Sequence, residues 1–499
     1  MNAYTYFARA FALRLPETVI ECDHGERYTY ADLDRESARF AAYLTGLGLR
    51  RGDRVAVQVD KSPQALFLYL ACLRAGLCYL PLNTAYQRGE LHYFLQDAKP
   101  GLIVCRPSTL DAIRELAAET GTPHVHTLHD DATGTLIDAA RDAPDRYDDV
   151  ELDDDALAVI IYTSGTTGRS KGAMVTHGNL SSNAQALTDG WAFSSTDVLL
   201  HALPIFHIHG LFVAFHTVLL SGARMLLQRR FDAGAVLRAL PDATVLMGVP
   251  TFYTRLLGEP GLTREAVQHM RLFVSGSAPL LPATFEAWRA RTGHVILERY
   301  GMSEAGMITS NPYAGERRCG TVGKPLPGVQ LRVADDTDAP LPVGTPGMVQ
   351  IKGPNVFAGY WGMPEKTREE FTADGWFRTG DIGQLDADGY LAIVGRAKDL
   401  IISGGYNVYP KEIELALDAL PGVIESAVIG VPDADYGEAV VAAVVKNADC
   451  ALDERGIVDA LRTQLAGYKL PRRVHFVDEL PRNAMGKVQK AALRERYGR

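Results

Sequence analysis

The sequence has no apolar run long enough to cross a bilayer. No stretch of about 18 apolar residues occurs in its 499 positions. The N-terminus also lacks a basic segment followed by an apolar segment and a small-residue cleavage site. We therefore expect a cytoplasmic protein that does not act at a membrane.

Cysteine and positive charge are also scarce. The net charge is −9 and the pI is about 5.8, which argues against a nucleic-acid-binding surface but leaves room for a locally basic nucleotide pocket. The six cysteines show none of the spacings typical of metal sites, so we expect reduced structural thiols. They are Cys22, Cys72, Cys78, Cys105, Cys319 and Cys450.

Apolar strand-like segments alternate with helical segments through the first 300 residues. A chain of this length exceeds one hydrophobic core, and this alternation predicts two doubly wound sheets with helices on both faces. Thr29 and Asp32 form a capping box that starts the first predicted helix. The helices are predicted at 63–75, 89–97, 178–188, 232–239, 251–257, 282–291, 410–419 and 453–465.

The pattern changes near residue 320. Short strands separated by glycine and proline at 329–333, 347–352 and 389–394 predict a small antiparallel barrel. Residues 397–499 have their own strands and helices and predict a small α+β domain. The fold class is therefore α/β: a large N-terminal domain at 1–396 with two doubly wound subdomains and the barrel, and a small mobile C-terminal domain at 397–499.

A loop rich in glycine and hydroxyl groups follows the apolar strand at 156–162. Glycines allow the backbone to approach an anion closely, and hydroxyls together with Lys171 add donors and charge, so the loop predicts a phosphate site. A P-loop is excluded because Lys171 is followed by Gly172 where that motif requires serine or threonine. The alternative is an ordinary surface turn. It does not explain why a run of small and hydroxylated residues directly follows a buried strand and ends in a lysine.

The segment Tyr-Thr-Ser-Gly-Thr-Thr-Gly-Arg-Ser-Lys-Gly at 162–172 resembles the phosphate loop of the adenylate-forming superfamily, which includes acyl-CoA synthetases, luciferases and peptide-synthetase adenylation domains. Further signatures of that superfamily follow in the expected order. They lie at 204–207, 275–280, 299–304, 376–381, 395–399 and 481–487.

The resemblance implies an ATP-dependent reaction in which a carboxylate attacks the α-phosphorus and pyrophosphate leaves. It implies Lys487, Glu304, Lys171 and Ser303 as catalytic residues, and Glu304 with Thr163 as ligands of magnesium, which prefers oxygen. The ATP-binding residues that it implies are Thr163, Ser164, Gly165, Thr166, Thr167, Gly168, Lys171, Gly276, Ser277, Ala278, Glu298, Tyr300, Gly301, Met302, Ser303, Asp381 and Arg396.

The C-terminal domain of the superfamily rotates between two half-reactions. By resemblance, Lys398 is the hinge, and Gly404, Gly405 and Tyr406 form the coenzyme A channel. Many relatives carry a basic residue where this chain has Ile402. Acetylation would remove the charge of Lys487, so lysine acetylation and deacylation enzymes are candidate partners.

Arg299 precedes the Tyr-Gly-Met-Ser-Glu motif, where many relatives have glycine. A buried guanidinium without an anion is costly, so Arg299 predicts an acyl substrate with a second carboxylate. The chain closely resembles malonyl-CoA synthetases, which implies malonate, with methylmalonate tolerated, and Arg255 with Arg299 as its anchor. Ser277, Met302 and His207 are implied as further acyl-pocket residues.

Several alternatives remain at this point. Arg255 could be an exposed helical arginine, and His207 a core histidine bonded to a backbone carbonyl. The substrate could be oxalate or succinate, or the acyl group could pass to a carrier protein. A non-catalytic nucleotide-binding relative is the alternative of another class, and retention of Lys171, Glu304 and Lys487 argues against it.

Overall fold

The computed structural model describes residues 1–163, 170–403, 406–433, 436–448, 452–462, 464–483 and 486–498. The chain divides into two compact units. The first unit contains Met1–Gln330 and Lys352–Phe371, and the second contains Leu331–Ile351 and Thr372–Arg499. The predicted boundary at residue 396 remains a prediction, although the contacts group part of the region before it with the C-terminal residues.

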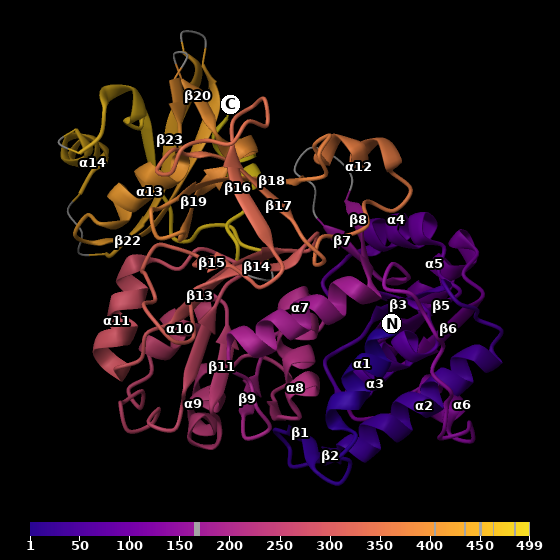
Figure 1. Cartoon of the computed structure of the whole chain (residues 1–499). Coiled ribbons are helices and arrows are strands. Elements are labelled where there is room, and N and C mark those ends of the chain that lie inside the picture. Colours follow the sequence, from indigo (N-terminus) through magenta and orange to yellow (C-terminus); the bar gives the residue numbers. More distant parts are fainter. Residues whose placement is uncertain are drawn as a thin grey trace. The chain divides into compact units, whose positions relative to one another are not determined.

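The first sheet of the first unit is a doubly wound sheet with the strand order β6-β5-β3-β4-β7-β8 (Figure 1). All of its pairings are parallel except β7 with β8. The strands are β3 (Arg54–Gln58), β4 (Cys78–Pro81), β5 (Leu102–Cys105), β6 (His124–Thr127), β7 (Leu157–Thr163) and β8 (Lys171–Thr176).

The second sheet has the order β15-β14-β13-β12-β11-β9-β10-β1-β2, with parallel pairing from β13 to β1 and antiparallel strands at both edges. Its strands are β1 (Thr18–Cys22), β2 (Arg27–Thr29), β9 (Val198–His201), β10 (Arg224–Leu227), β11 (Val245–Gly248), β12 (Leu272–Ser275), β13 (Leu297–Met302), β14 (Gly306–Ser310) and β15 (Lys324–Pro325).

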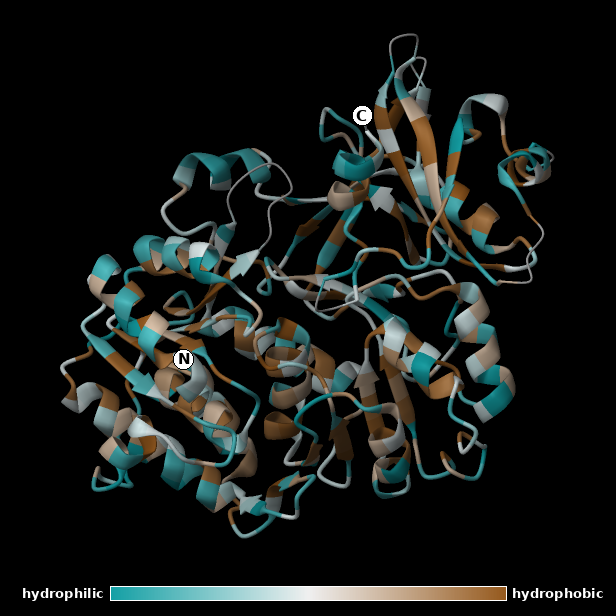
Figure 2. Cartoon of the chain, turned by 180° about the vertical axis from the view of Figure 1, so that it is seen from behind, coloured by the Kyte–Doolittle hydropathy of each residue, from teal (hydrophilic) through white to brown (hydrophobic). Residues whose placement is uncertain are grey.

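Helices of the first unit cover these sheets with their apolar faces turned inward (Figure 2), whereas α12 (Pro364–Glu370) buries none of its residues. Helix α3 (Pro63–Arg74) is buried at every position, which explains its nearly continuous apolar sequence. The others are α1 (Ala3–Phe11), α2 (Tyr30–Gly46), α4 (Arg88–Ala98), α5 (Leu110–Thr120), α6 (Thr135–Ala140), α7 (His177–Gly190), α8 (His216–Ser221), α9 (Ala233–Ala239), α10 (Pro250–Leu257), α11 (Pro282–Thr292) and α12 (Pro364–Glu370), with a π-helical segment at His209–Phe215.

The second unit contains two sheets. The region predicted as a barrel is a four-stranded sheet ordered β16-β17-β18-β19, with antiparallel pairing of β17 with β18 and of β18 with β19. The strand pattern of a sequence indicates which segments are strands but not whether the sheet closes into a barrel. Its strands are β16 (Gln330–Ala334), β17 (Gly347–Lys352), β18 (Phe377–Leu385) and β19 (Leu391–Arg396). The other sheet contains β20 (Ile401–Ser403), β21 (Tyr406–Val408), β22 (Val423–Asp433), β23 (Gly437–Lys446) and β24 (Arg473–Phe476).

Alternating residues of β22 and β23 fill two cores on opposite faces of that sheet. Val428, Val440 and Val444 pack with the faces of α13 (Pro410–Asp418) and α14 (Glu454–Leu461). Ile429 and Val441 belong to the other core, together with Leu493 of α15 (Lys490–Tyr497). Successive side chains of a strand point to opposite faces of the sheet, so one strand can contribute to both cores only if the side chains on both of its faces are apolar. This is the case for β22 and β23.

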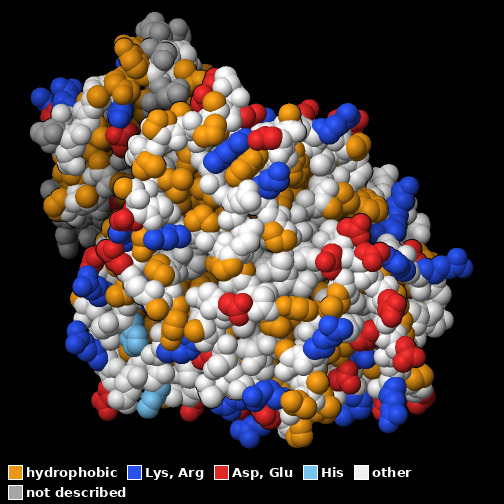
Figure 3. Space-filling view, viewed as in Figure 1, with side chains coloured by type: hydrophobic (Ala, Val, Ile, Leu, Met, Phe, Trp, Pro, Cys, Tyr) orange, Lys and Arg blue, Asp and Glu red, His pale blue; other side chains and the backbone are white. Residues whose placement is uncertain are grey.

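The mixed α/β fold class, with two doubly wound sheets and a separate C-terminal α+β part, is confirmed. The capping box is also present, because Thr29 accepts from the Asp32 N–H and Asp32 accepts from the Thr29 N–H. Positive and negative side chains are interspersed on the face seen in Figure 3. Within the part of the chain that is described, no helix combines the length and apolarity needed to cross a membrane.

Candidate active site

Lys171 lies at the end of the predicted phosphate loop, at the start of β8. It pairs in register with Thr163 on β7, whose hydroxyl donates to the Lys171 carbonyl over 3.4 Å. The antiparallel pairing therefore brings both ends of the loop together. Ser164, Gly165, Thr166, Thr167 and Gly168 lie outside the described residues.

The Lys171 ammonium is held by two residues of a later segment. Its Nζ lies 4.1 Å from the centre of the Tyr360 ring and 3.4 Å from Oε1 of Glu370. Ala173 forms a backbone bridge with Tyr360, which fixes this segment beside β8. The lysine is thus positioned by a cation–π contact and an ion pair that sequence reasoning did not anticipate.

Tyr360 connects Lys171 to Glu304. Its hydroxyl donates to Oε1 of Glu304 over 3.1 Å, and burial together with the negative charges of Glu304 and Glu370 raises the pKa of Tyr360. Glu304 is buried, and its carbonyl accepts from the Phe357 N–H. The cluster therefore presents a carboxylate and an ammonium on a rigid support, as a magnesium-bound polyphosphate requires.

Arg299 is buried on β13, as predicted, with 3% of its surface exposed. Among the described residues, its Nε and Nη2 have no hydrogen-bond partner. Burial lowers its pKa to about 9, against an ordinary value of 12.5. Gly276 makes room for the guanidinium, because a Cβ at that position would lie 2.4 Å from the Arg299 Cζ.

Ser277 and His209 lie beside this arginine. Ser277 has a positive φ of 71°, and its hydroxyl lies 3.3 Å from Nδ1 of His209. Burial first, and then the charge of Arg299, lower the pKa of His209 well below its ordinary value, so the ring is neutral. His209 Nε2 is buried without a hydrogen-bond partner among the described residues. Arg299 therefore offers two donors without an acceptor among the described residues, and the hydrogen-bonded pair of neutral His209 and Ser277 has one further donor between them.

The other predicted acyl residues lie in different environments. His207 is half-buried, and its Nδ1 accepts from the His209 N–H over 3.2 Å. Arg255 is exposed in the last turn of α10, so its anchoring role remains a prediction. Met302 and Tyr300 are half-buried on β13.

The remaining nucleotide residues of the first unit lie around the ends of β12 and β13. Glu298 is buried and accepts from the Leu280 N–H over 3.2 Å. Gly301 has no room for a side chain, because a Cβ would lie 2.2 Å from the Gly306 carbonyl oxygen. Ala278 and Ser303 are half-buried.

The second unit contributes a separate charged group. Asp381 on β18 pairs in register with Arg396 on β19, and the Arg396 Nε lies 2.9 Å from the Asp381 carboxylate. Lys487 is half-buried near both, and burial and the charge of Arg396 lower its pKa to about 8. Its backbone N–H donates to Asn483 Oδ1 over 3.0 Å, which closes the turn that carries it.

Lys398, the predicted hinge, is exposed just after β19. Tyr406, predicted in the coenzyme A channel, is also exposed and stacks on Tyr468 with ring centres 4.7 Å apart. Gly404 and Gly405 lie outside the described residues.

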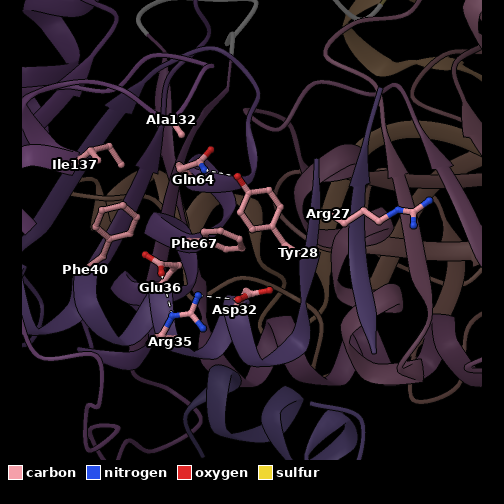
Figure 4. Close-up of a pocket in the computed structure, with 10 residues that line it drawn as sticks. All are labelled: Arg27, Tyr28, Asp32, Arg35, Glu36, Phe40, Gln64, Phe67, Ala132 and Ile137. Carbon is pink, nitrogen blue, oxygen red and sulfur yellow. Dashed lines mark hydrogen bonds and ion pairs between the residues drawn. The ribbon is translucent and has the colours of Figure 1, made fainter. Parts of the chain in front are cut away.

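A cavity of about 280 Å³ lies away from all these residues (Figure 4). Phe40 and Phe67 form its apolar part, and its charged groups are already paired: Arg35 with Asp32 over 2.7 Å, and Arg27 with Glu21 over 2.8 Å. We assign no role to it, since size alone does not define a site.

Two doubly wound sheets and a separate C-terminal α+β part, together with the family model that matches the chain, define an adenylate-forming enzyme. The chain belongs to the AMP-binding enzyme family, whose model matches residues 8–361, while the model of the AMP-binding enzyme C-terminal domain matches residues 412–487.

Known proteins resemble the chain over nearly its whole length. The crystal structure of ATP-bound MatB from Rhodopseudomonas palustris is 54% identical, with a TM-score of 0.97, and the match covers 100% of this chain and 99% of that one. A feruloyl-CoA synthase of Amycolatopsis is 38% identical over 95% of both chains. The malonate–CoA ligase of Arabidopsis thaliana is 36% identical over 94% of this chain and 85% of its own. The chain is therefore an adenylate-forming CoA ligase, and the expected resemblance to malonate–CoA ligases is confirmed.

Proposed function

We propose that this ligase joins malonate to coenzyme A, with methylmalonate as a tolerated substrate. The reaction consumes ATP, passes through an acyl-adenylate, and releases AMP and pyrophosphate. The observation that carries the proposal is the buried Arg299 guanidinium with two nitrogens that lack partners among the described residues. The similarity to a malonate–CoA ligase supports it independently.

Arg299 discriminates between substrates by its need for an anion. A dicarboxylate leaves one carboxylate to react and offers the other to the guanidinium, and the hydrogen-bonded pair of neutral His209 and Ser277 supplies one further donor. A monocarboxylate of equal size would leave the buried guanidinium charge of Arg299 unpaired, which costs several kcal/mol. Ferulate, the acid that corresponds to the product named for one relative, carries no second carboxylate, so the buried Arg299 guanidinium argues against it as the substrate.

In the first half-reaction, a carboxylate oxygen of malonate attacks the α-phosphorus, and the bond to pyrophosphate breaks. Lys171, held by Tyr360 and Glu370, supplies positive charge to the phosphates, and Lys487 stabilises the charge that develops on the reacting groups. Asp381 accepts from the ribose hydroxyls beside Arg396. Magnesium supplies further charge neutralisation, and Glu304 with Thr163 would hold it.

In the second half-reaction, the coenzyme A thiol attacks the acyl carbon and AMP leaves. We assign Lys398 as the hinge between the two half-reactions and Tyr406 to the coenzyme A channel, which their exposure supports. Acetylation of Lys487 would remove the ammonium and stop the first half-reaction alone. If a deacylase leaves the activity of protein purified from cells unchanged, this regulation is wrong.

The test is coenzyme A-dependent AMP release with malonate, methylmalonate, oxalate, succinate, acetate, butyrate and ferulate, in wild type and in Arg299→Leu. We expect malonate to have the highest kcat/KM in the wild type. In the leucine variant, kcat/KM for malonate should fall by at least about 100-fold, because losing the charge pair costs several kcal/mol and each 1.4 kcal/mol is a factor of ten. Its kcat/KM for monocarboxylates should rise. Arg255→Leu, at the exposed position, measures how much of the anchoring that residue supplies.

Each contrary outcome has a defined meaning. If acetate, butyrate or ferulate leads in the wild type, the malonate assignment is wrong and only the general ligase assignment stands. If succinate or oxalate has the highest kcat/KM and Arg299→Leu loses activity toward it, the need for a second carboxylate is correct and the proposed chain length of the substrate is wrong. No AMP release with any acid, with ATP bound, would favour the non-catalytic alternative.

A further inference from the structure

Three different metal-ligating side chains converge on the β1–β2 hairpin, far in the sequence from the motifs of the ligase. The Cys22 thiol, the His24 imidazole and the Glu26 carboxylate each offer one ligand atom, and these atoms all lie within 4.8 Å of one another. In the described part of the chain, this is the one group of three or more such side chains that meets that criterion. Neither ATP nor the acyl substrate is assigned to these residues.

The backbone of the hairpin fixes this convergence. The Cys22 N–H donates to the Glu26 carbonyl over 2.8 Å, and the Gly25 N–H donates to the Cys22 carbonyl over 3.0 Å. Gly25 has a φ of 94°, which a side chain at that position would oppose. The turn therefore places alternate residues on one side, with Cys22 buried and His24 and Glu26 exposed to ions in solution.

Both nitrogens of the His24 ring face a carboxylate. Nδ1 lies 3.1 Å from Oδ1 of Asp23, and Nε2 lies 3.3 Å from Oε2 of Glu26. A neutral imidazole has one N–H, so one of these contacts would set a nitrogen lone pair against a carboxylate oxygen. The arrangement therefore requires a cation at the second nitrogen, either a proton or a metal ion.

The surrounding groups distinguish a metal site from a simple ion pair. With its N–H on Nδ1 bonded to Asp23, His24 directs the Nε2 lone pair toward the Glu26 carboxylate, 3.3 Å away, an arrangement common to metal-bound histidines. Tyr28 accepts from Gln64 over 2.9 Å (Figure 4) and donates to the Glu26 carboxylate over 3.0 Å, so the carboxylate is oriented as well. Each exposed ligand thus has a partner that fixes its direction.

We propose that Cys22, His24 and Glu26 bind a divalent transition ion of the zinc class, with water in the fourth position. One sulfur, one nitrogen and one oxygen suit zinc or cobalt, whereas magnesium and calcium prefer sites made entirely of oxygen. The magnesium used with ATP should therefore not compete. Binding displaces the thiol proton of Cys22, and any proton on the second nitrogen of His24, to solvent, so the thiolate and the carboxylate neutralise the divalent ion and the imidazole binds it as a neutral ligand.

Bound metal would join the end of β1 to the start of β2 at the edge of the second sheet. Strand β1 pairs with β10 through Cys22 and Leu227, whereas β2 pairs with β1 alone among the described strands. A metal that binds only the folded hairpin raises the stability of that edge by mass action.

The experiment is a cobalt titration of the full-length protein without ATP, followed by visible and near-ultraviolet absorption. We expect one equivalent of Co²⁺ to give a thiolate charge-transfer band with tetrahedral ligand-field bands, displaced by one equivalent of Zn²⁺ and unaffected by a thousand-fold excess of Mg²⁺. Cys22→Ser should remove the thiolate band. His24→Gln and Glu26→Gln should weaken cobalt affinity by at least about tenfold, and Asp23→Asn by about 10- to 100-fold.

The matched control is Cys319→Ser, which removes a half-buried free thiol that belongs to no such cluster. It should leave the band unchanged, and all variants should keep the circular dichroism and AMP-release rate of the wild type. The proposal is overturned if the wild type gives no thiolate band, which is the result expected when a proton occupies His24. It is also overturned if His24→Gln binds cobalt as tightly as the wild type, or if the band disappears in Cys319→Ser.

Discussion

The shifted pKa of Lys487 gives a direct prediction for the first half-reaction. Burial and the charge of Arg396 lower that pKa to about 8, while Asp381 and Asp399 partly oppose the shift. Because the pKa lies below the ordinary lysine value, the ammonium is lost as pH rises through about 8. For that pKa, about nine-tenths of the side chain is charged at pH 7 and about one-tenth at pH 9.

If the ammonium stabilises the reacting groups, the rate should follow its fraction. The assay is malonate-dependent exchange of pyrophosphate into ATP without coenzyme A, so that the thiol of coenzyme A does not contribute to the profile. At saturating substrates, kcat should fall by about tenfold between pH 7 and pH 9. Arg299, whose pKa burial lowers to about 9, faces the acyl group, so its titration should change KM for malonate instead.

Lys487→Arg separates this explanation from a general loss of structure. A guanidinium stays charged, so this variant should be slower at pH 7 but should show no fall in kcat between pH 7 and pH 9. Lys490→Arg is the matched control, because Lys490 donates to Glu414 and lies outside the proposed reaction. A fall at the same pH in Lys487→Arg as in wild type would refute the assignment.

Three other substitutions test the rest of the site. Gly276→Ala should push the Arg299 guanidinium aside and raise KM for malonate by at least about tenfold. Gly46→Ala is the control, because a Cβ there meets nothing within 4 Å, and it should leave KM unchanged. Equal KM values in the two variants would contradict the packing argument. Asp381→Asn should weaken ATP binding measured by calorimetry, because the side chain loses its charge and one of its two acceptor oxygens, and Arg396 loses its ion pair; unchanged affinity would place the ribose elsewhere. Tyr360→Phe should lower the free energy of unfolding in urea by about 1 kcal/mol and raise KM for MgATP, because Glu304 loses a donor; an unaltered KM would separate Tyr360 from the nucleotide site.

Most of the fold could be predicted because its signals are local. The helix predicted at 251–257 is α10 at Pro250–Leu257, and that at 282–291 is α11 at Pro282–Thr292, since proline and glycine mark their ends. The N-terminal strands were harder. β1 pairs with its neighbour β2, but it also pairs in parallel with β10 about 200 residues later, and this second pairing leaves no trace in periodicity.

The candidate site divides in the same way. Arg299 was recognisable because a charged residue replaced glycine inside a motif, and the structure confirms its burial. Tyr360 and His209 were missed because their roles depend on contacts across long separations in the chain: Tyr360 with Lys171 and Glu304, and His209 with Ser277. A motif search identifies the residue that a ligand touches more readily than the residue that holds it.

Gly276 shows why a motif position can have two meanings. The superfamily resemblance assigns it to the nucleotide, where a glycine allows close approach of the backbone. In this chain the same missing side chain also makes room for the Arg299 guanidinium, which any Cβ would meet at 2.4 Å. A relative with glycine in place of Arg299 would not need that second space, so the two positions are coupled here. The proposed specificity for an anionic acyl group therefore depends on a pair of residues, one charged and one without a side chain, and neither alone would predict it.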